Sequence, residues 1–158
     1  MDKIPLHGIG MKLKVIGGIF LIITCIIHYI FYPFFCIKFI PYLITLTTGI
    51  ILLASGIPFS IIATIDLIKA YNSDKLITTG LFSISRNPMY GSFMIFIIPG
   101  ISFILNSWLV LTGSLLIYIL VRIFIKEEET YLEKRYGKEY LDYKNKVGLF
   151  FPKIIRKK

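Results

Sequence analysis

The chain has 158 residues, enough for one domain, and 56% of them are hydrophobic. Its mean hydropathy is +0.76. Charged residues make up only 17% of the chain, against about 25% in a typical soluble domain. This composition excludes an ordinary soluble domain and favours an integral membrane protein. The formal net charge is +9, and we expect membrane lipids, not nucleic acid, to be its partners.

Three stretches of the chain contain no Asp, Glu, Lys or Arg, and they lie at residues 15–37, 39–65 and 87–121. A helix needs about 20 apolar residues to cross a bilayer, so each of the first two stretches is long enough for one span. The first stretch is longer than the apolar core of a signal peptide and no small-residue cleavage site follows it, so we expect it to be retained. The second contains Pro58, which predicts a kink or an early helix end.

The third stretch is too long for one helix and barely long enough for two. It is interrupted at residues 99–100 by Pro-Gly and at residues 106–107 by Asn-Ser. These interruptions predict a tight helical hairpin that turns between Leu105 and Trp108. Because membrane helices tolerate proline, Pro99 could instead kink the first arm. The predicted spans are therefore approximately 14–35, 40–65, 88–104 and 107–125.

The distribution of basic residues orients these spans. Three lysines lie before residue 15, Lys38 is alone in the first connection, three basic residues lie in the connection 66–90, and eleven follow from Arg122 onward. Lys and Arg are enriched on the cytoplasmic side of membrane proteins. We therefore expect one all-α membrane domain over residues 1–158, in the cell membrane, with both termini cytoplasmic. Its four helices would include the C-terminal hairpin and be followed by an amphipathic cytoplasmic tail.

Polar residues gather in two segments, 74–91 and 126–152, and both are expected on the cytoplasmic side. In the first, residues 78–80 (Thr-Thr-Gly) predict a turn. Asn87 followed by Pro88 predicts a helix start with proline in its preferred first position. The unpaired N–H groups of such a helix start could hold an anionic group at the mouth of the bundle.

The second segment begins with three consecutive glutamates at residues 127–129. On a helix they point in directions separated by about 100°, so they cannot all face one pocket. We expect one or two of them to point inward. Arg122 and Lys126 lie about one turn earlier and could offset part of their repulsion.

Each segment also has a simpler explanation. Arg86 could bind a lipid phosphate and Tyr90 could belong to the aromatic belt at the membrane surface. The glutamates could simply be solvated where the helix leaves the membrane.

Residues in both segments carry a family pattern. The first segment has Gly80, Phe82, Arg86-Asn87-Pro88 and Tyr90; the second has Glu128-Glu129, Leu132, Tyr136-Gly137, Tyr140, Tyr143, Val147 and Pro152. In this order, on either side of an apolar hairpin, these residues resemble the isoprenylcysteine carboxyl methyltransferase family and its phospholipid methyltransferase relatives. The resemblance covers roughly residues 70–152.

The resemblance implies an enzyme that takes its methyl group from S-adenosylmethionine, bound in a pocket at the cytoplasmic face. No metal site is expected, because the spacing of the two cysteines, Cys25 and Cys36, matches no metal motif. The resemblance assigns the cofactor's adenosine side to Lys75, Leu76, Ile77 and Phe82, and its methionine part to Asn87, Pro88, Met89 and Tyr90. Glu128 would contact the cofactor from the opposite helix. Arg86 would bind the cofactor carboxylate or brace the loop, and Arg86 and Glu128 are the implied catalytic residues.

Two positions depart from the family pattern. Asn87 replaces the family histidine and cannot titrate near neutral pH, which argues against a general base there. Phe124 stands where the protein-prenyl enzymes have an arginine, and Arg122 is rotated about 200° from that position. The expected substrate-binding residues are Arg122, Phe124 and Glu129, with a lipid-like or isoprenylated acceptor. A carboxylate acceptor would need only positioning, whereas an amine would need a base such as Glu128 or Glu129.

Two other functions are compatible with the sequence. Membrane sterol reductases, which use a reduced nicotinamide cofactor, share an Arg-His-Pro-x-Tyr element and a late Tyr-Gly…Tyr…Pro pattern. Their exit helix tends to carry mixed Arg and Asp, where this chain has consecutive glutamates. A non-catalytic membrane protein on the same scaffold is the third possibility.

Overall fold

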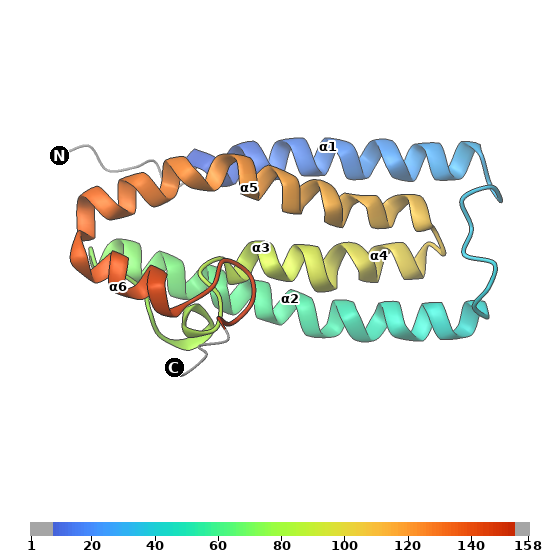
Figure 1. The fold of residues 1–158 in the computed structure, drawn as a ribbon. Helices are drawn as coiled ribbons and strands as arrows, with labels where there is room; N and C mark the ends of the chain where they lie inside the picture. The colour runs from blue at the N-terminus through green and yellow to red at the C-terminus, as the bar shows by residue number, and fades with distance from the viewer. Residues whose placement is uncertain (1–7, 154–158) are drawn as a thin grey trace.

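The computed structural model describes residues 8–153, and this part of the chain is all-helical, as the sequence predicts (Figure 1). The only β pairing within it is two isolated bridges. Its elements, in chain order, are α1 (Gly8–Ile30), α2 (Tyr42–Asn72), η1 (Gly80–Ser83), α3 (Pro88–Ser92), η2 (Phe93–Ile97), α4 (Ile98–Ile104), α5 (Trp108–Tyr136) and α6 (Lys138–Lys146).

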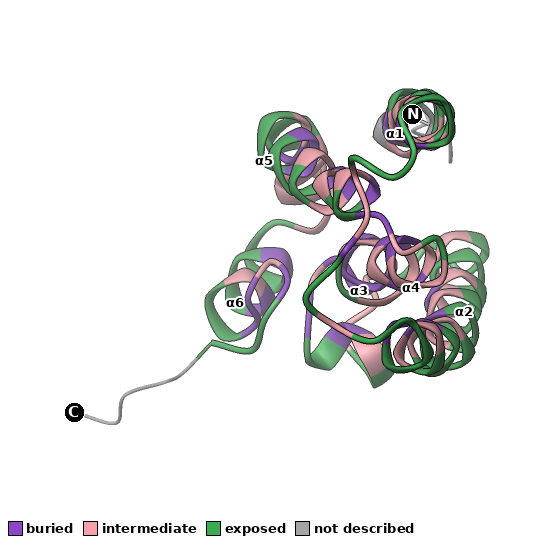
Figure 2. Ribbon diagram, turned by 90° about the vertical axis from the view of Figure 1, so that its right-hand side faces the viewer, coloured by how far each residue is buried: buried purple, intermediate pink, exposed green. Residues whose placement is uncertain are grey.

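Three of these helices are long and apolar enough to cross a membrane: α1 from Lys12 to Ile30, α2 and α5. The apolar helix Pro88–Ile104, which comprises α3, η2 and α4, is shorter. Many large apolar side chains are exposed, among them Ile22 and Ile51, with 61% and 64% exposed. Figure 2 shows exposed positions along α1, α2 and α5. Such a surface is stable when lipid, not water, surrounds it. The protein is therefore an integral membrane protein.

The first two helices differ from the expected spans. α1 ends at Ile30, five residues early, because Pro33 disfavours helical backbone in the residue before it. α2 continues through Pro58 to Asn72, so of the two alternatives predicted at Pro58 the early helix end is wrong, and the kink stays a prediction. Close to Pro58, the Ser92 hydroxyl of the neighbouring α3 donates a 2.8 Å hydrogen bond to the Gly56 carbonyl. This bond joins α3 to α2 beside the proline, and interior proline is better tolerated in membrane helices than in soluble ones.

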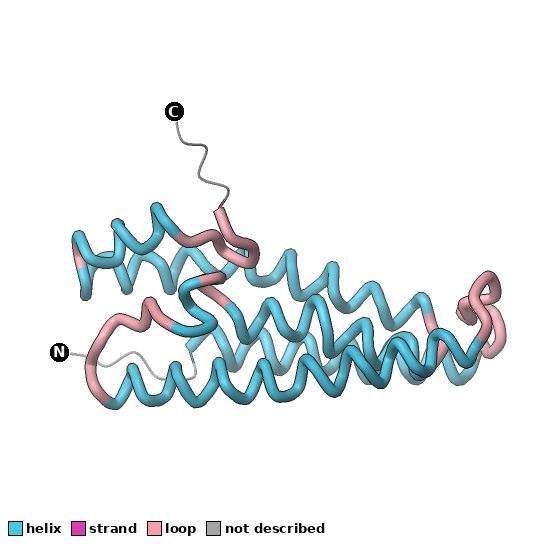
Figure 3. The backbone as a smooth tube through the Cα atoms, turned by 90° about the horizontal axis from the view of Figure 1, so that it is seen from below, coloured by secondary structure: helices cyan, strands magenta, loops and turns pink. Residues whose placement is uncertain are grey.

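The segment from Pro88 to Ile104 stays helical through Pro99 because its hydrogen-bond register changes just before that residue. The five residues of η2 form a π-helical turn, and Pro99 follows in the first turn of α4. Residues 105–107 then connect α4 to α5, and the two helices pack side by side (Figure 1). Figure 3 draws the loops at this end of the bundle in pink. α5 continues without a break to Tyr136, where Gly137, with φ of 52°, ends it.

Two apolar clusters hold the helices together. The larger one joins α1, α3–α4, α5 and the C-terminal segment; its buried members are Leu13, Tyr90, Ile98, Ile117, Leu120, Val121, Ile125 and Phe150. The smaller one joins α6 to the end of α5 and to the loop after α2; it is formed by Tyr140, Tyr143 and Val147 with Leu76, Leu132 and Tyr136. The smaller cluster folds α6 back against residues 73–87, so it brings the two polar segments together.

Candidate functional site

A cavity of about 800 Å³ lies where the two polar segments meet. Its lining comes from α1, the end of α2, the loop 73–87, α3, the end of α5 and α6. Pockets for small molecules and cofactors usually have volumes of about 300–1,000 Å³. The cavity is thus large enough for a cofactor, and both polar segments contribute to its wall.

Backbone hydrogen bonds with the C-terminal segment fix the loop that enters the cavity. The Arg86 N–H donates to the Gly148 carbonyl at 2.9 Å, and the Asn87 N–H donates to the Leu149 carbonyl at 3.2 Å. The Ser85 hydroxyl donates to the same Leu149 carbonyl at 2.9 Å. The loop reverses at Gly80, where φ is +59° and glycine is favoured. Asn87 and Pro88 then begin α3 with proline in its first turn, as predicted.

An ion-pair network connects the two polar segments across the cavity wall. The Arg86 guanidinium pairs with Glu129 and donates a 3.4 Å hydrogen bond to the Tyr140 hydroxyl. Lys144 of α6 lies 2.9 Å from the other Glu129 oxygen and also pairs with Glu133. The Arg86 and Glu129 side chains are only 11% and 16% exposed, so water screens their interaction little. Arg86 therefore braces the loop against α5 and α6.

The network shifts the pKa values of two α6 side chains, Tyr140 and Lys144. Burial raises the pKa of the Tyr140 phenol, and the negative charge of Glu129 raises it further. The hydrogen bond to Glu133, followed by the one to Glu129, raises the pKa of Lys144 above its ordinary value. Lys144 therefore remains cationic at neutral pH and helps to neutralise Glu129.

The three consecutive glutamates have different surroundings. Glu127 is exposed, whereas Glu128 and Glu129 are partly buried, so the expectation that only some of them point inward is confirmed. Arg86 and Lys144 neutralise Glu129, and among the described residues neither Arg122 nor Lys126 forms an ion pair with the glutamates, which corrects the expected offset. No described lysine or arginine pairs with Glu128. It is the sheltered carboxylate of the cavity that lacks a protein cation.

A second ion pair joins Asp74, just after α2, to Arg135 near the end of α5. The Arg135 guanidinium also lies near the rings of Tyr131 and Tyr136, with its central carbon 5.8 and 5.7 Å from their centroids. Because Asp74, Arg135 and both tyrosines line the cavity, these contacts form part of its wall between α2 and α5.

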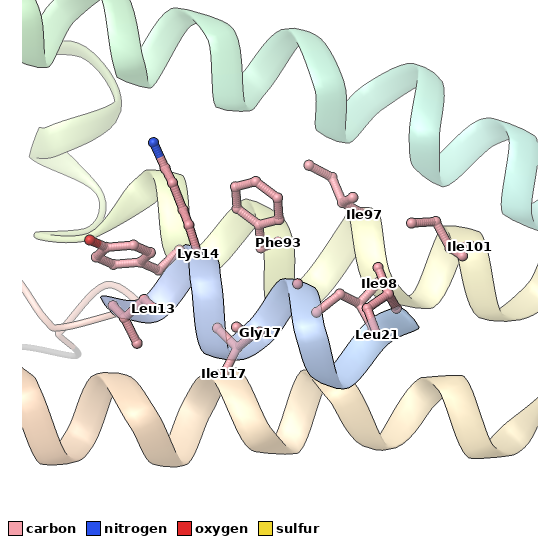
Figure 4. Close-up of a pocket in the computed structure, with 11 residues that line it drawn as sticks. Leu13, Lys14, Gly17, Leu21, Phe93, Ile97, Ile98, Ile101 and Ile117 are labelled. Atoms are coloured by element: carbon pink, nitrogen blue, oxygen red, sulfur yellow. The ribbon is translucent and has the colours of Figure 1, made fainter. Parts of the chain in front are cut away.

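A smaller apolar groove of about 240 Å³ adjoins the cavity (Figure 4). It lies between α1, the η2–α4 segment and α5. Lys14 is at one end, and Leu21 and Ile101 are at the other. Lys14 and Tyr90 line both the groove and the large cavity, so the two spaces are neighbours that share part of their walls.

Comparison with known proteins agrees with this architecture. Residues 42–139, well over half of the chain, match the family model described as phospholipid methyltransferase. The chain belongs to this family. It is also similar to the protein-S-isoprenylcysteine O-methyltransferase of Saccharomyces cerevisiae, with 36% identity over 89 residues. That match covers 54% of this chain and 36% of the relative, so the chain corresponds to about a third of the relative's length.

The family resemblance singled out thirteen residues, and most of them border the cavity. Those that line it are Lys75, Leu76, Ile77, Phe82, Arg86, Asn87, Met89, Tyr90, Glu128 and Glu129. Three others lie outside its lining. Pro88 is buried in α3, Arg122 is exposed, and Phe124 is partly buried against the larger apolar cluster.

The contribution of α1 and α2 to the cavity was not predicted from the sequence. α1 supplies Gly10, Lys12 and Lys14, whose lysines were interpreted only as orientation signals. α2 supplies Thr64, Ile68 and Tyr71, among others. These three residues are spaced four and three apart and therefore share one helix face, a signal that could have identified them.

Proposed function

We propose that this protein is an S-adenosylmethionine-dependent methyltransferase that binds its cofactor in the 800 Å³ cavity and acts on a lipid-like acceptor. The observation that carries the proposal is the contrast between Glu128 and Glu129. Two cations neutralise Glu129, whereas Glu128 is sheltered in the same wall without one. A carboxylate in this position fits a ligand that carries an ammonium and a sulfonium. When bound, the cofactor would supply a methyl group whose bond to sulfur breaks, leaving the electron pair on sulfur, as a bond to the acceptor forms.

The other site residues take roles that follow from their places in the wall. Lys75, Leu76, Ile77 and Phe82 form one group, which we assign to the adenosine side. The group Asn87–Tyr90 begins α3 and is assigned to the methionine part, with Pro88 setting the backbone from outside the lining. Arg86 and Glu129 are positioning residues, because their ion pair holds the loop against α5. Asn87 cannot act as a general base at neutral pH, which favours an acceptor that is already ionised.

The same proposal includes a membrane topology. α1, α2, the Pro88–Ile104 helix and the first part of α5, to about residue 125, would each span the bilayer, the last two as a hairpin. The 17 residues from Pro88 to Ile104 extend about 26 Å, slightly less than the hydrocarbon core of about 30 Å. Lys and Arg are concentrated before residue 15, in the connection 66–90 and after residue 121. This distribution supports a protein of the cell membrane whose termini, cavity and tail 126–152 face the cytoplasm. Reporter fusions after Lys38 and after Lys158 should then report opposite sides, and the same side for both would contradict it.

Binding measurements on the purified protein in detergent test the cofactor. S-adenosylmethionine and its demethylated product should bind, and reduced nicotinamide dinucleotides should not. Glu128→Gln should weaken binding by about 1–3 kcal/mol, the usual scale for a lost contact to a charged group. Glu127→Gln is the matched control: Glu127 also borders the cavity, but its side chain is exposed to solvent, so the substitution should change affinity little.

Equal losses for Glu127→Gln and Glu128→Gln would contradict the role given to Glu128. Preferential binding of the nicotinamide cofactor would contradict the proposed methyltransferase activity and support the sterol-reductase alternative. Transfer of a labelled methyl group into a lipid extract then tests activity directly. A cofactor-binding protein that labels no lipid would refute a lipid-like acceptor.

A further inference from the structure

α1 lies outside the region that matches the family, which begins at residue 42. It nevertheless lines both the large cavity and the apolar groove. Residues outside a shared scaffold are free to differ between relatives that share its chemistry. α1 is therefore a candidate for the element that distinguishes this protein's acceptor from those of its relatives.

The charges lining the cavity are divided between its walls. Arg86 and Arg135 are paired with Glu129 and Asp74, respectively. Lys12 and Lys14 of α1, like Lys75 of the loop after α2, form no ion pair with any described carboxylate. The Lys12 ammonium lies 5.6 Å from the centroid of the Phe124 ring, a cation–π contact that directs it toward α5. The α1 wall thus offers positive charge, whereas Glu128 offers negative charge from α5.

The groove beside Lys14 has the opposite character. Apart from Lys14 and the Tyr90 ring, its lining is glycine or aliphatic and aromatic side chains such as Leu21, Phe93 and Ile97. A Cβ atom added at Gly18 would meet nothing within 4 Å, so the glycine leaves open space along this face of α1. A cation at the junction of a polar cavity and an apolar groove matches a molecule with an anionic head and an apolar tail.

We propose that α1 selects the acceptor: Lys14, assisted by Lys12, holds an anionic headgroup at the junction, and the groove takes the apolar tail. The proposal deepens the proposed function and rests on it, because it names the acceptor class of the same site. An ammonium-headed lipid would be repelled by the two lysines. A carboxylate headgroup would be attracted, and it needs no base because it is ionised at neutral pH. Lys14 is a specificity-determining residue in this assignment and Glu128 belongs to the cofactor side.

The test measures amphiphile binding to the full chain in nanodiscs of zwitterionic lipid, as displacement of a fluorescent fatty acid. The competitors share a twelve-carbon tail and differ in the head: dodecanoate, dodecanol and dodecylamine. Dodecanoate should displace the probe at the lowest concentration. Lys14→Gln should raise the dodecanoate concentration required by about tenfold, the scale of a lost contact between charged groups, and leave dodecanol unchanged. Lys14→Arg should restore most of the affinity.

The tail is tested by filling the groove. Gly18→Leu should weaken dodecanoate several-fold and hexanoate little, because only the longer tail reaches the filled space. Ile22→Phe adds bulk to an exposed position of the same helix, and Lys38→Gln removes a lysine from the first connection. Both controls should leave displacement unchanged.

Three results would overturn the inference: dodecylamine binding as tightly as dodecanoate, Lys14→Gln weakening dodecanol as much as dodecanoate, or Gly18→Leu without effect on dodecanoate. This readout requires neither cofactor nor methyl transfer. If S-adenosylmethionine does not bind while dodecanoate follows the expected pattern, the proposed function fails and the amphiphile site stands. If the cofactor binds and the lysine and glycine variants behave as wild type, only the inference fails.

Discussion

The two ends of the bundle are stabilised by different kinds of interaction. At the end away from the cavity, the connections 31–41 and 105–107 meet through backbone hydrogen bonds. The Ile37 N–H donates to the Asn106 carbonyl and the Trp108 N–H to the Phe35 carbonyl, each at 3.1 Å. At the cavity end, backbone hydrogen bonds likewise join residues 86–87 to residues 148–149. Only this end, among the described residues, adds ion pairs such as Arg86–Glu129 and the hydrogen bonds of the α6 tyrosines.

The helices also approach each other differently at the two ends. We call the end away from the cavity the closed end. Near it, α2 and α4 are in contact at glycine positions: a Cβ added at Gly49 would lie 2.7 Å from the Gly100 carbonyl oxygen. Small residues allow such close packing in membranes. At the other end the elements enclose the 800 Å³ cavity. We infer that the tightly packed end secures the fold. Side chains at the cavity end, and with them the ligands bound there, can change with a smaller loss in the free energy of unfolding.

The largest effect is expected from breaking the closed end. Gly49→Leu would force the added side chain into the backbone of α4, since Gly100 and Ile104 backbone atoms lie within 3 Å of the added Cβ. Overpacking of this kind costs typically 1–3 kcal/mol, and contact with backbone places this variant at about 3 kcal/mol. Thermal unfolding in detergent should show a large loss of stability.

The matched control is Gly18→Ala, where nothing lies within 4 Å of the added Cβ. It should be neutral or slightly stabilising, because alanine is the better helix former. A Gly49→Leu protein that unfolds at the wild-type temperature would show that close packing of α2 and α4 does not secure the fold.

A smaller effect is expected from breaking the ion pair at the cavity end. Arg86→Met would leave Glu129 with Lys144 as its cation. Removing one partner of a fully buried pair costs about 3–5 kcal/mol. Because Lys144 remains and both side chains are slightly exposed, we expect about 2 kcal/mol in the free energy of unfolding. Cofactor affinity should fall as well, because the loop loses its brace.

Arg122→Met is the control, since Arg122 is exposed on the same helix as Glu129 and forms no ion pair among the described residues. A double-mutant cycle with Glu129→Gln should give a favourable coupling energy between Arg86 and Glu129. Additive losses in that cycle would show that the two residues stabilise the protein independently.

The sequence predicted the closed end and the motif positions more successfully than the contacts around the cavity. The apolar stretches and the turn residues predicted helices, a turn between Leu105 and Trp108 and a helix start at Asn87-Pro88, because these features depend on local composition. The pairing of Arg86 and Asn87 with residues 148 and 149 depends on how distant segments fold together. The ion pair between Lys144 and Glu129 also depends on tertiary folding. It forms because α6 folds back over α5, and no residue spacing within one helix predicts it.

The smallest effect is expected from the contact that docks α6 on the loop. The Tyr143 hydroxyl donates a 2.7 Å hydrogen bond to the Phe82 carbonyl, and a single bond of this kind contributes about 1 kcal/mol. Tyr143→Phe should speed hydrogen exchange of the amides in 138–150 several-fold at pH 7. Amides around 100–110, at the closed end, should keep their wild-type rates. Tyr118→Phe is the control, because Tyr118 is exposed on α5.

Raising the pH should reduce the difference between Tyr143→Phe and wild type. Burial raises the pKa of Tyr143 above the ordinary tyrosine value of about 10. A group whose pKa is raised by folding contributes its full stability below the unfolded pKa and loses it as pH rises through the folded pKa. Wild-type α6 should therefore open more easily above about pH 10, and the phenylalanine variant should lose less over that range. If the phenylalanine variant also accelerates exchange at 100–110, the two ends are not stabilised separately and the comparison fails.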